Sequence, residues 1–317
     1  MTSLQRDRDQ AGPVPSTAVV GVVSAYNPGP ENVGNIAWLL KYVTRVVVVD
    51  DGSSADVDAV LDDIRALGAE VLRLEENSGI ARALNTGIKH ARESWDPEWI
   101  VTMDQDSRFS GDYIGAALAA AEASPDRATI GMVCAESHNH VPVPLLTPQG
   151  QEEPEVFDPM TSGSLVHAST FDRIGYFNED YFIDCVDTEF NARIREAGLR
   201  SIAAPGCNLE HSLGHARPMI ILGWRVRVGA KKINIYYHSP FRVYYITRNS
   251  IVMARTYFRK QPAWVLRRLY MEFQSHVVRF VFGPDRRKHA LAASCGVRDA
   301  LRHRMGRIDA GLAARLR

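Results

Sequence analysis

Two carboxylates, Asp50 and Asp51, follow a run of four valines and come directly before Gly52 and two serines. A carboxylate at the end of an apolar strand can accept hydrogen bonds from a nucleobase N–H or a ribose hydroxyl. Asp and Ser are also favoured in turns and at helix N-caps. The cluster alone therefore fits either a nucleoside-binding site or a turn that starts a helix.

A second cluster, Asp104, Gln105 and Asp106, follows the apolar stretch 99–103. Carboxylate oxygens are the ligands that Mg²⁺ and Mn²⁺ prefer, and the spacing can bring both acids to one side where the chain turns. A metal held there would neutralise a departing diphosphate. A solvated acidic turn is the alternative interpretation.

Three acids, Asp184, Asp187 and Glu189, lie within six residues beside Tyr181 and Phe182. A carboxylate that is partly desolvated has a raised pKa and can take a proton from a hydroxyl group. Acids also favour the first turn of a helix, where they meet its dipole. The segment therefore predicts either a general base or a helix start.

His211 and His215 lie in the polar segment 210–215. A neutral imidazole is a common metal ligand. A histidine in a loop can equally be structural or exposed, and distance along the chain does not decide between these alternatives.

Short β-branched runs alternate with helical patterns over the first hundred residues, which indicates a parallel sheet with crossover helices. The predicted strands are 17–24, 45–49, 70–74 and 99–103, and the predicted helices are 56–67 and 79–91. Ligands bind at the carboxyl ends of strands in open α/β sheets, where the first two clusters lie. Residues 137–160 predict a long surface loop, and helical patterning returns over 171–199.

The charge of the chain is divided along its length. The 317 residues carry 37 Lys and Arg against 37 Asp and Glu, but residues 218–317 carry 21 basic and four acidic residues. The front, residues 1–217, has the corresponding acidic surplus of 17. An acidic front suits cation binding, and a basic tail suits anionic lipid, phosphate or nucleic acid.

The cysteines favour a reducing compartment, and the hydropathy of the chain shows neither a signal peptide nor a membrane-spanning run. The four cysteines form no CxxC pair, so neither a disulfide framework nor a zinc ribbon is indicated. The polar residues 1–16 predict a disordered arm rather than a signal peptide. Because the sequence contains no uncharged apolar run of roughly 20 residues, we expect any membrane contact to be peripheral.

Aromatic residues alternate with Arg and Lys beyond Pro218. Apolar residues at positions 266, 269, 270, 273, 277, 280 and 281 fall on one stripe of a helix. Such a stripe packs into a core or faces an anionic membrane, and both interpretations stay open.

Taken in order, these clusters resemble family 2 glycosyltransferases with the GT-A fold, and more narrowly bacterial rhamnosyltransferases that use dTDP-rhamnose. The resemblance covers residues 19–251. It depends on the segments VVSAYNP (22–28), VVVVDDGSS (46–54), ENSGIARALNTGI (76–88), VTMDQDS (101–107), SGSLV (162–166), GYFNEDYFIDCVDTEFNARIREAG (175–198), EHSLG (210–214) and YYITRN (244–249).

The resemblance implies roles for the nucleotide and metal ligands. Asp50 and Asp51 would hold the nucleoside, and Asn77 and Arg82 would help to cradle the nucleotide. Asp104 would face the ribose and the metal. The direct ligands of Mg²⁺ or Mn²⁺ would be Asp106 and His211, together with Asp104.

The resemblance also implies the catalytic and acceptor groups. Asp187 matches the acid of the family's acidic motif, but Val186 stands where many relatives have an acid, which leaves Asp184 as a possible base or partner. Ser162 and Gly163 would lie beside the sugar and the acceptor. Arg248 could contact an acceptor phosphate. The reaction would be a single displacement that inverts the anomeric carbon.

The resemblance predicts an α/β GT-A fold, with a Rossmann-like, mostly parallel sheet between flanking helices. Residues 17–217 would form the catalytic domain, with a nucleotide-binding half, 17–107, and an acceptor half, 108–217. Residues 218–317 would form a basic, aromatic-rich helical region that can associate with membrane. The partners would be a nucleotide-sugar, a polyprenyl-linked glycan and an anionic membrane surface on the cytoplasmic side, with no nucleic acid; an oligomer is possible.

Three alternatives remain open. A UDP-sugar such as UDP-galactofuranose is a rival donor. A nucleotidyltransferase would also use a nucleotide and a metal, but residues 25–30 lack the basic, glycine-rich loop it usually carries. A non-catalytic protein that binds membrane or nucleic acid would leave the acidic front unexplained.

Overall fold

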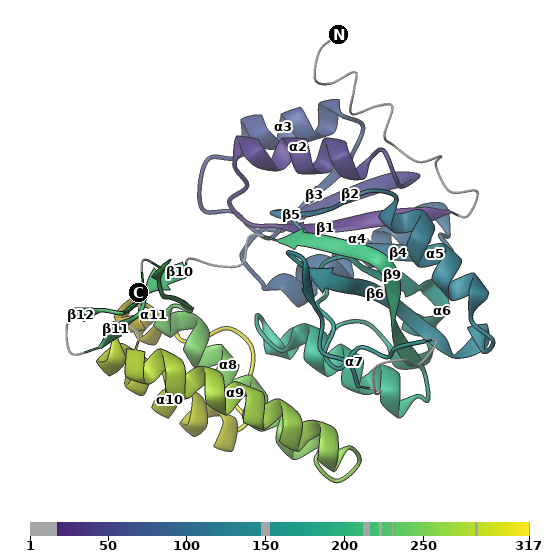
Figure 1. Ribbon diagram of the computed structural model, residues 1–317. Coiled ribbons are helices and arrows are strands. Elements are labelled where there is room, and N and C mark those ends of the chain that lie inside the picture. Colours follow the sequence, from purple (N-terminus) through teal and green to yellow (C-terminus); the bar gives the residue numbers. More distant parts are fainter. Residues whose placement is uncertain are drawn as a thin grey trace. The chain divides into compact units, whose positions relative to one another are not determined.

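The computed structural model describes residues 18–146, 153–211, 216–221, 224–229, 231–282 and 285–316. They form two compact units (Figure 1). The sheet unit comprises the chain up to Glu179 and Val186–His211, and the helical unit comprises Asp180–Cys185 and the chain from residue 212 onward. The predicted disordered arm, 1–16, lies outside the described residues.

The sheet unit is built on one mixed sheet with the strand order β3-β2-β1-β4-β8-β6-β9-β5, and β7 pairs with β6. Strands β3, β2, β1 and β4 are parallel to their neighbours, as are β6 and β9, whereas β8 is antiparallel to both β4 and β6. The strands are β1 (Val19–Ala25), β2 (Arg45–Asp50), β3 (Glu70–Arg73), β4 (Trp99–Asp104), β5 (Ser107–Phe109), β6 (Ile130–His138), β7 (Val141–Pro142), β8 (Ser164–His167) and β9 (Arg200–His211).

Helices cover both faces of this sheet, which is why its central strands are continuous apolar runs rather than alternating ones. On one face Val19, Val23, Val46 and Val48 share a hydrophobic cluster with three helices. These are α2 (Pro30–Leu39), α3 (Asp58–Ala66) and α5 (Tyr113–Ala123). On the other face α4 (Ile80–Trp95) contacts β1 and β2. Two further helices, α6 (Ala168–Ile174) and α7 (Val186–Glu196), come later in the chain.

Four predicted strands and two predicted helices correspond to β1, β2, β3, β4, α3 and α4. The prediction of a surface loop over 137–160 is wrong for Val156 and Phe157, which are buried, because a bridge joins Val156 to Leu145. Residues 147–152 of that loop lie outside the described residues.

The helical patterning predicted over 171–199 is not one helix. Helix α6 ends at Ile174 because Gly175 adopts a φ of 79° there, and α7 begins only at Val186. Between them a short 3₁₀ helix, η2 (Glu179–Tyr181), leads into Asp180–Cys185, which packs in the helical unit.

The helical unit contains four helices, among the residues described: α8 (Pro240–Tyr257), α9 (Pro262–Phe282), α10 (Arg286–Leu301) and α11 (Ala310–Leu316). Its core gathers Phe182 with Tyr244 and Tyr245 of α8, Ala292 of α10 and Leu316 of α11. The rings of Phe182 and Tyr245 stack with centroids 5.2 Å apart. The segment 180–185 is therefore part of this core.

Short paired strands precede these helices: β10 (Ala216–Pro218), β11 (Ile220–Ile221), β12 (Trp224–Arg225), β13 (Arg227–Val228), β14 (Lys231–Lys232) and β15 (Asn234–Tyr236). In the described part of the chain, no helix has both the length and the apolarity needed to cross a bilayer.

Candidate active site

The carboxyl ends of three parallel strands bring the first two acidic clusters to one edge of the sheet. In the register of β1 with its neighbours, Ala25 pairs with Asp50 of β2 and Ser24 pairs with Asp104 of β4. The two acids therefore flank the end of β1. This is the position at which open α/β sheets bind ligands.

Asp50 is fully buried and is held by charged and polar neighbours. Its Oδ1 accepts hydrogen bonds from the backbone N–H of Ser53, at 3.2 Å, and from the Ser53 hydroxyl. Its Oδ2 lies 3.0 Å from Nε of Arg73 and forms an ion pair with it, but not a hydrogen bond. Arg73 thus offsets the cost of burying this carboxylate.

Asp51 joins the end of β2 to the start of α4. Its two carboxylate oxygens accept from the backbone N–H groups of Ser78 and Gly79, at 2.7 and 2.8 Å. Gly52 makes this approach possible, because its φ is +60° and an added Cβ would lie 2.2 Å from the carbonyl carbon of Glu76. Only glycine tolerates both conditions.

The other two residues predicted to cradle the nucleotide follow in chain order. Asn77 lies between Glu76 and Ser78 on the same loop and is partly buried. Arg82 lies in the first turn of α4, and its Nη1 donates to Glu179 at 3.1 Å. The loop 75–79 and the start of α4 therefore stand beside Asp51.

Gln105 fixes the turn that carries Asp104 and Asp106. Its side-chain oxygen accepts from the backbone N–H of Tyr26 at 2.9 Å, and its side-chain nitrogen donates to the Tyr26 carbonyl at 3.3 Å. Its own carbonyl accepts from the side-chain amides of Asn32 and Asn35, at 2.9 and 2.8 Å. These contacts hold both neighbouring acids in defined positions.

The loop after β1 bonds to both acidic clusters. Besides the contact of Tyr26 with Gln105, the side-chain oxygen of Asn27 accepts from the backbone N–H groups of Ser54 and Ala55, at 2.9 and 3.0 Å. The loop therefore couples the two turns that carry the four acids.

The pairing of β5 with β9 brings the backbone of His211 to the same edge. In the antiparallel register, His211 is opposite Ser107, the residue that follows Asp106. The side chain of His211 lies outside the described part of the structure. Among the side chains that are described, no three of the types His, Cys, Asp and Glu gather closely enough to hold a metal ion.

Ser162 and Gly163 lie against the end of β4. The backbone N–H of Asp104 donates to Oγ of Ser162 at 3.0 Å, and the backbone N–H of Gly163 donates to the carbonyl of Thr102 at 2.8 Å. Tyr113 donates its hydroxyl to the Gly163 carbonyl at 2.6 Å. Burial raises the pKa of Tyr113 well above its usual value, so this hydroxyl stays protonated and remains a donor.

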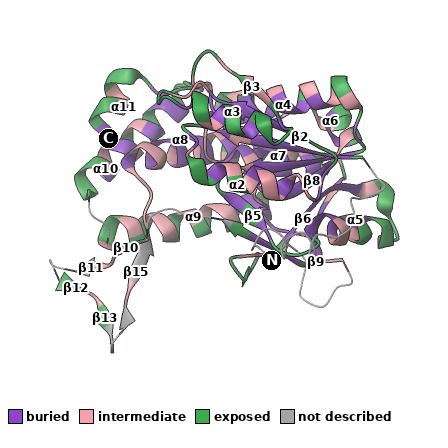
Figure 2. Ribbon diagram, turned by 90° about the horizontal axis from the view of Figure 1, so that it is seen from above, coloured by how far each residue is buried: buried purple, intermediate pink, exposed green. Residues whose placement is uncertain are grey.

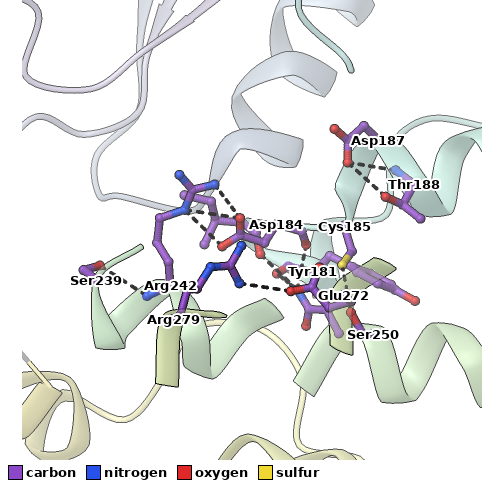
Figure 3. A network of polar contacts seen from close by, with 12 residues as sticks. Tyr181, Asp184, Cys185, Asp187, Thr188, Ser239, Arg242, Ser250, Glu272 and Arg279 are labelled. Carbon is purple, nitrogen blue, oxygen red and sulfur yellow. Dashed lines mark hydrogen bonds and ion pairs between the residues drawn. The ribbon is translucent and has the colours of Figure 1, made fainter. Parts of the chain in front are cut away.

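Asp187 lies in the first turn of α7, partly buried. Its Oδ1 accepts from the backbone N–H of Thr188 at 2.8 Å, as Figure 3 shows. Asp187 also lines a small cavity of about 10 Å³ together with Thr161 and Ser164. Such a cavity has room for about one water molecule. Asp187 therefore lies beside the segment that contains Ser162 and Gly163.

Asp184 belongs to the helical unit and is engaged by an arginine. Its side chain is 7% exposed, and Nη2 of Arg242 lies 2.5 Å from its Oδ1 (Figure 3). In the same network Nη1 of Arg279 lies 3.1 Å from Glu272. Asp184 and Asp187 thus have different partners although two residues separate them.

Arg248 is buried, with 1% of its surface exposed. Its guanidinium donates to the carbonyl of Gly306 at 2.7 Å and to the carbonyl of Tyr181 at 3.4 Å. These contacts tie α8 to the segment 180–185. The acceptor role expected of Arg248 stays a prediction.

Sequence reasoning missed Gln105 as the anchor of the turn that carries Asp104 and Asp106, and it missed Asn32 and Asn35 as the donors to Gln105. Two asparagines three residues apart share one face of a helix, which is the signal that could have indicated a common acceptor. Asn249 was also missed. It is buried and donates to the carbonyls of Tyr181, Ile183 and Asp184 at 3.0, 2.9 and 2.8 Å.

Comparison with known families and proteins agrees with this geometry. Residues 22–164 match the model of the family described as glycosyl transferase family 2. The chain is 29% identical over 249 residues to "dTDP-rhamnosyl transferase RfbF" of Shigella flexneri, a match that covers 75% of this chain and 80% of the relative. It is 25% identical over 240 residues to "N-acetylglucosaminyl-diphospho-decaprenol L-rhamnosyltransferase" of Mycobacterium tuberculosis, covering 63% and 78%.

Two solved structures share the fold. Residues 1–349 of TarS from S. aureus superpose with a TM-score of 0.52 at 18% identity, covering 90% of this chain and 81% of that chain. The mannosyltransferase PcManGT from Pyrobaculum calidifontis, in complex with GDP-Man and Mn²⁺, superposes with a TM-score of 0.51 at 17% identity, covering 98% and 84%. At these identities the likeness concerns the fold alone, and it confirms the predicted GT-A architecture with a helical C-terminal region.

Proposed function

We propose that this chain, a glycosyltransferase that carries a glycosyl transferase family 2 domain over residues 22–164, transfers L-rhamnose from dTDP-rhamnose to a lipid-linked glycan acceptor. The names of the two relatives support a rhamnosyl donor, and the second name also supports a polyprenyl-diphosphate acceptor. The product would serve cell-envelope polysaccharide synthesis.

One observation supports this proposal most: two strand registers bring the backbone positions of Asp104 and His211 to the same edge of the sheet. The register of Ser24 with Asp104 and that of Ser107 with His211 both end at the turn that carries Asp106. Asp187 shares a cavity lining with Thr161 and Ser164, which flank Ser162 and Gly163. A donor at this edge would therefore meet a metal-binding turn and a carboxylate beside the acceptor segment.

The nucleotide would lie along the ends of β1 and β2. Asp50 and Asp51 would face the base and the ribose. Asn77 and Arg82 would contact the remainder of the nucleotide from the adjacent loop and helix, where the start of α4 provides a favourable place for negative charge.

Asp104, Asp106 and His211 fit Mg²⁺ or Mn²⁺ as a donor set. Two carboxylates and an imidazole are ligands that Mn²⁺ accepts, and Gln105 fixes the turn that carries both acids. A bound divalent cation would supply positive charge against the negative charge that grows on the leaving diphosphate. Metal dependence is further supported by the Mn²⁺ in the mannosyltransferase of similar fold.

Asp187 would accept the proton of the acceptor hydroxyl while that oxygen attacks the anomeric carbon. The bond to the diphosphate breaks on the opposite face of the sugar, so the configuration inverts in one displacement. The electron pair of the broken bond leaves with dTDP. Ser162 and Gly163 would position the sugar and the acceptor, and Asp184 is the alternative base.

A lipid-linked acceptor places the reaction at a membrane surface. We therefore propose that the protein works as a peripheral protein on the cytoplasmic face of the membrane. The basic surplus of residues 218–317 supports this location, since the cytoplasmic leaflet is anionic.

A donor panel tests the proposal. The full chain is incubated with dTDP-rhamnose, UDP-galactofuranose and other UDP-sugars in Mn²⁺ or Mg²⁺, and both the released nucleotide and the melting temperature are measured. We expect release of dTDP and thermal protection chiefly by dTDP-rhamnose, because a donor that binds the folded state stabilises it.

Each rival function predicts a different result. Protection by UDP-sugars alone would replace the rhamnosyl donor by a UDP-sugar donor. Release of pyrophosphate would identify a nucleotidyltransferase. A chain that binds membrane or nucleic acid but turns over no nucleotide-sugar would be a binding protein.

A further inference from the structure

Helix α9 has an exposed face with many large apolar residues, although Trp264 and Val265 near its start are buried. Figure 2 shows much of this helix as exposed. The large side chains on its outward face are Leu266 (56% exposed), Tyr270 (61%), Phe273 (66%), Val277 (41%), Phe280 (49%) and Val281 (45%). Their spacing of three and four residues places them on one face of the helix. An exposed apolar stripe of this kind marks an interaction surface.

The opposite face of α9 carries a charged network turned toward the helical unit. The carboxylate of Glu272 lies 3.0 Å from Nη1 of Arg268, 3.1 Å from Nη1 of Arg279 and 2.9 Å from Nδ1 of His276. The side chain of Glu272 is only 14% exposed. Burial alone would raise the pKa of Glu272, but its hydrogen bond with His276 and the charges of Arg268 and Arg279 hold it below its usual value. His276 of this network also lies 3.2 Å from the hydroxyl of Thr247 on α8, so this face of α9 is turned toward the helical unit.

An apolar hollow adjoins the outward face. It has a volume of about 240 Å³ and is lined by α8, α9 and α10. Val277, Phe280 and Val281 line the hollow and also belong to the outward face, and Val243 and Ala290 lie across from them. The hollow thus opens where a hydrocarbon chain lying on α9 would reach.

Exposed basic residues flank both ends of this apolar face. Arg259, Lys260 and Arg267 lie at its start, and two arginines and a lysine at 286–288 follow its end. Three of the four acids in residues 218–317, Glu272, Asp285 and Asp299, bond to groups within the helical unit. Residues 218–317 carry a surplus of 17 positive charges, and the basic side chains at both ends of the apolar face are among those that are exposed.

This charge decides what covers the face. A second copy of the chain that docked through the same face would bring two strongly basic regions together, and like charges repel. An anionic bilayer supplies both an apolar interior for the aromatic side chains and headgroups for the flanking cations. An interfacial helix has this combination of a polar face, an apolar face and flanking basic residues.

We propose that the outward face of α9 docks on an anionic lipid bilayer, with its aromatic side chains at the level of the headgroups and one hydrocarbon chain entering the adjoining hollow. The inference deepens the proposed function, on which it rests for the source of the lipid, because it names the surface that brings the enzyme to a lipid-linked acceptor.

Vesicle flotation of the full chain tests the proposal. Vesicles of phosphatidylcholine alone are compared with vesicles that also contain phosphatidylglycerol. The apolar variant carries Tyr270→Ser, Phe273→Ser and Phe280→Ser. The matched control is Val141→Ser in the sheet unit, whose side chain, 65% exposed, is as accessible as that of Phe273, which is 66% exposed. A charge variant carries Arg286→Gln, Arg287→Gln and Lys288→Gln.

We expect the wild type and Val141→Ser to float with the anionic vesicles and only weakly with neutral ones. The apolar variant should lose at least tenfold in vesicle affinity, and the charge variant roughly fivefold for each removed cation. Circular dichroism checks that the variants are folded. The proposal is overturned if the apolar variant binds as well as the wild type, or if the wild type is a dimer that the apolar variant converts to a monomer.

Turnover of dTDP-rhamnose, measured without vesicles, separates this inference from the proposed function. A wild type that turns over the donor but binds no anionic vesicle overturns the docking surface alone. A wild type that binds anionic vesicles through α9 but consumes no nucleotide-sugar overturns the proposed function and leaves the surface standing.

Discussion

The two units treat charged side chains in opposite ways. In the sheet unit, the acids Asp50 and Asp51 lie at the ends of buried strands, 0% and 5% exposed, and are held by nearby donors. In the helical unit, the charged side chains on the inner face of α9, which are 11–16% exposed, pair with one another, and large apolar side chains of the same helix face outward. We propose that the first arrangement serves to bind a ligand and that the second serves to dock on a lipid surface.

This contrast teaches that burial alone does not identify a functional acid. Glu272 is mostly enclosed, with 14% of its side chain exposed, but its neighbours on α9 neutralise it. At the sheet edge, by contrast, the turn that carries Asp104 and Asp106 is held by backbone and amide groups of Tyr26, Gln105 and Asn32. Its geometry therefore does not depend on the charges of the two acids. The predictions below test whether chemistry is confined to the sheet unit.

The largest effect should follow Asp187→Asn. An amide cannot accept the acceptor's proton, and a positioned general base contributes roughly 10²- to 10⁴-fold to the rate. We expect kcat for dTDP release to fall by that factor, with little change in the thermal protection given by the donor. Asp63→Asn, an exposed acid on α3, is the control and should keep wild-type turnover.

The variant Asp184→Asn decides between the two candidate bases. If Asp187→Asn retains turnover and Asp184→Asn does not, the base belongs to the helical unit, and the assignment of chemistry to the sheet unit is wrong.

The next largest effect concerns Asn249. Its side chain is fully buried and donates to three carbonyls of the segment 180–185, so Asn249→Ala leaves three acceptors without this donor. We expect a loss of about 2–4 kcal/mol in the free energy of unfolding, measured by chemical denaturation. Thr256→Ala, at an exposed position on the same helix, should cost less than about 0.5 kcal/mol.

Asn249→Ala should also lower turnover in the molecules that remain folded, because the segment it holds runs directly into α7 and Asp187. An unchanged kcat together with lowered stability would show that the helical unit supports the fold without influencing the carboxylate of Asp187.

Loss of a metal ligand should have an intermediate effect. If Asp106 is a direct ligand, Asp106→Asn should weaken the Mn²⁺-dependent donor affinity by at least about tenfold, as loss of even outer-shell partners of a metal does. Chelation of divalent ions should abolish turnover of the wild type, and added Mn²⁺ should restore it. Equal turnover with and without chelator would exclude the metal role of this turn, whereas Asp63→Asn again serves as the unaffected control.

The sequence predicted the strands of the sheet unit well because strands buried on both faces must be continuous apolar runs, as Val46–Val49 are. It also predicted the acidic turns, because Asp and Gly directly after an apolar strand are typical turn residues. The contacts that fix those turns, such as Asn32 and Asn35 on Gln105, join residues about seventy positions apart. No local pattern specifies such pairs.

The segment 180–185 shows why the rest could not be predicted. Phe182, Asp184 and Cys185 adopt φ angles of 62°, 63° and 60°, which residues other than glycine rarely do. Each costs roughly 1–2 kcal/mol, so local preference argues against this conformation. Tertiary contacts sustain it, among them Arg242 on Asp184 and Asn249 on the carbonyls. The helix-like pattern of the sequence was therefore misleading at this point.

The smallest effect should be a pH dependence of the helical unit. Burial, followed by the charges of Arg279 and Arg242, lowers the pKa of His238 from 6.5 to about 3, although Glu272 acts in the opposite direction. Because the folded state holds this imidazole neutral and the unfolded state does not, stability is complete above pH 6.5. It falls as the pH drops toward 3, by at most about 1.4 kcal/mol at pH 5.5.

Thermal unfolding of the wild type and of His238→Gln at pH 7.5 and 5.5 measures the pH-dependent contribution of His238 to stability. The difference in stability between the two pH values should be smaller in His238→Gln, because glutamine does not titrate. An equal pH dependence in both proteins would mean that the imidazole is protonated in the folded state. Water would then reach His238 and screen it from the charges of Arg279 and Arg242. The charged face of α9 would be less enclosed than the structure indicates, and the contrast between the two units would be weaker.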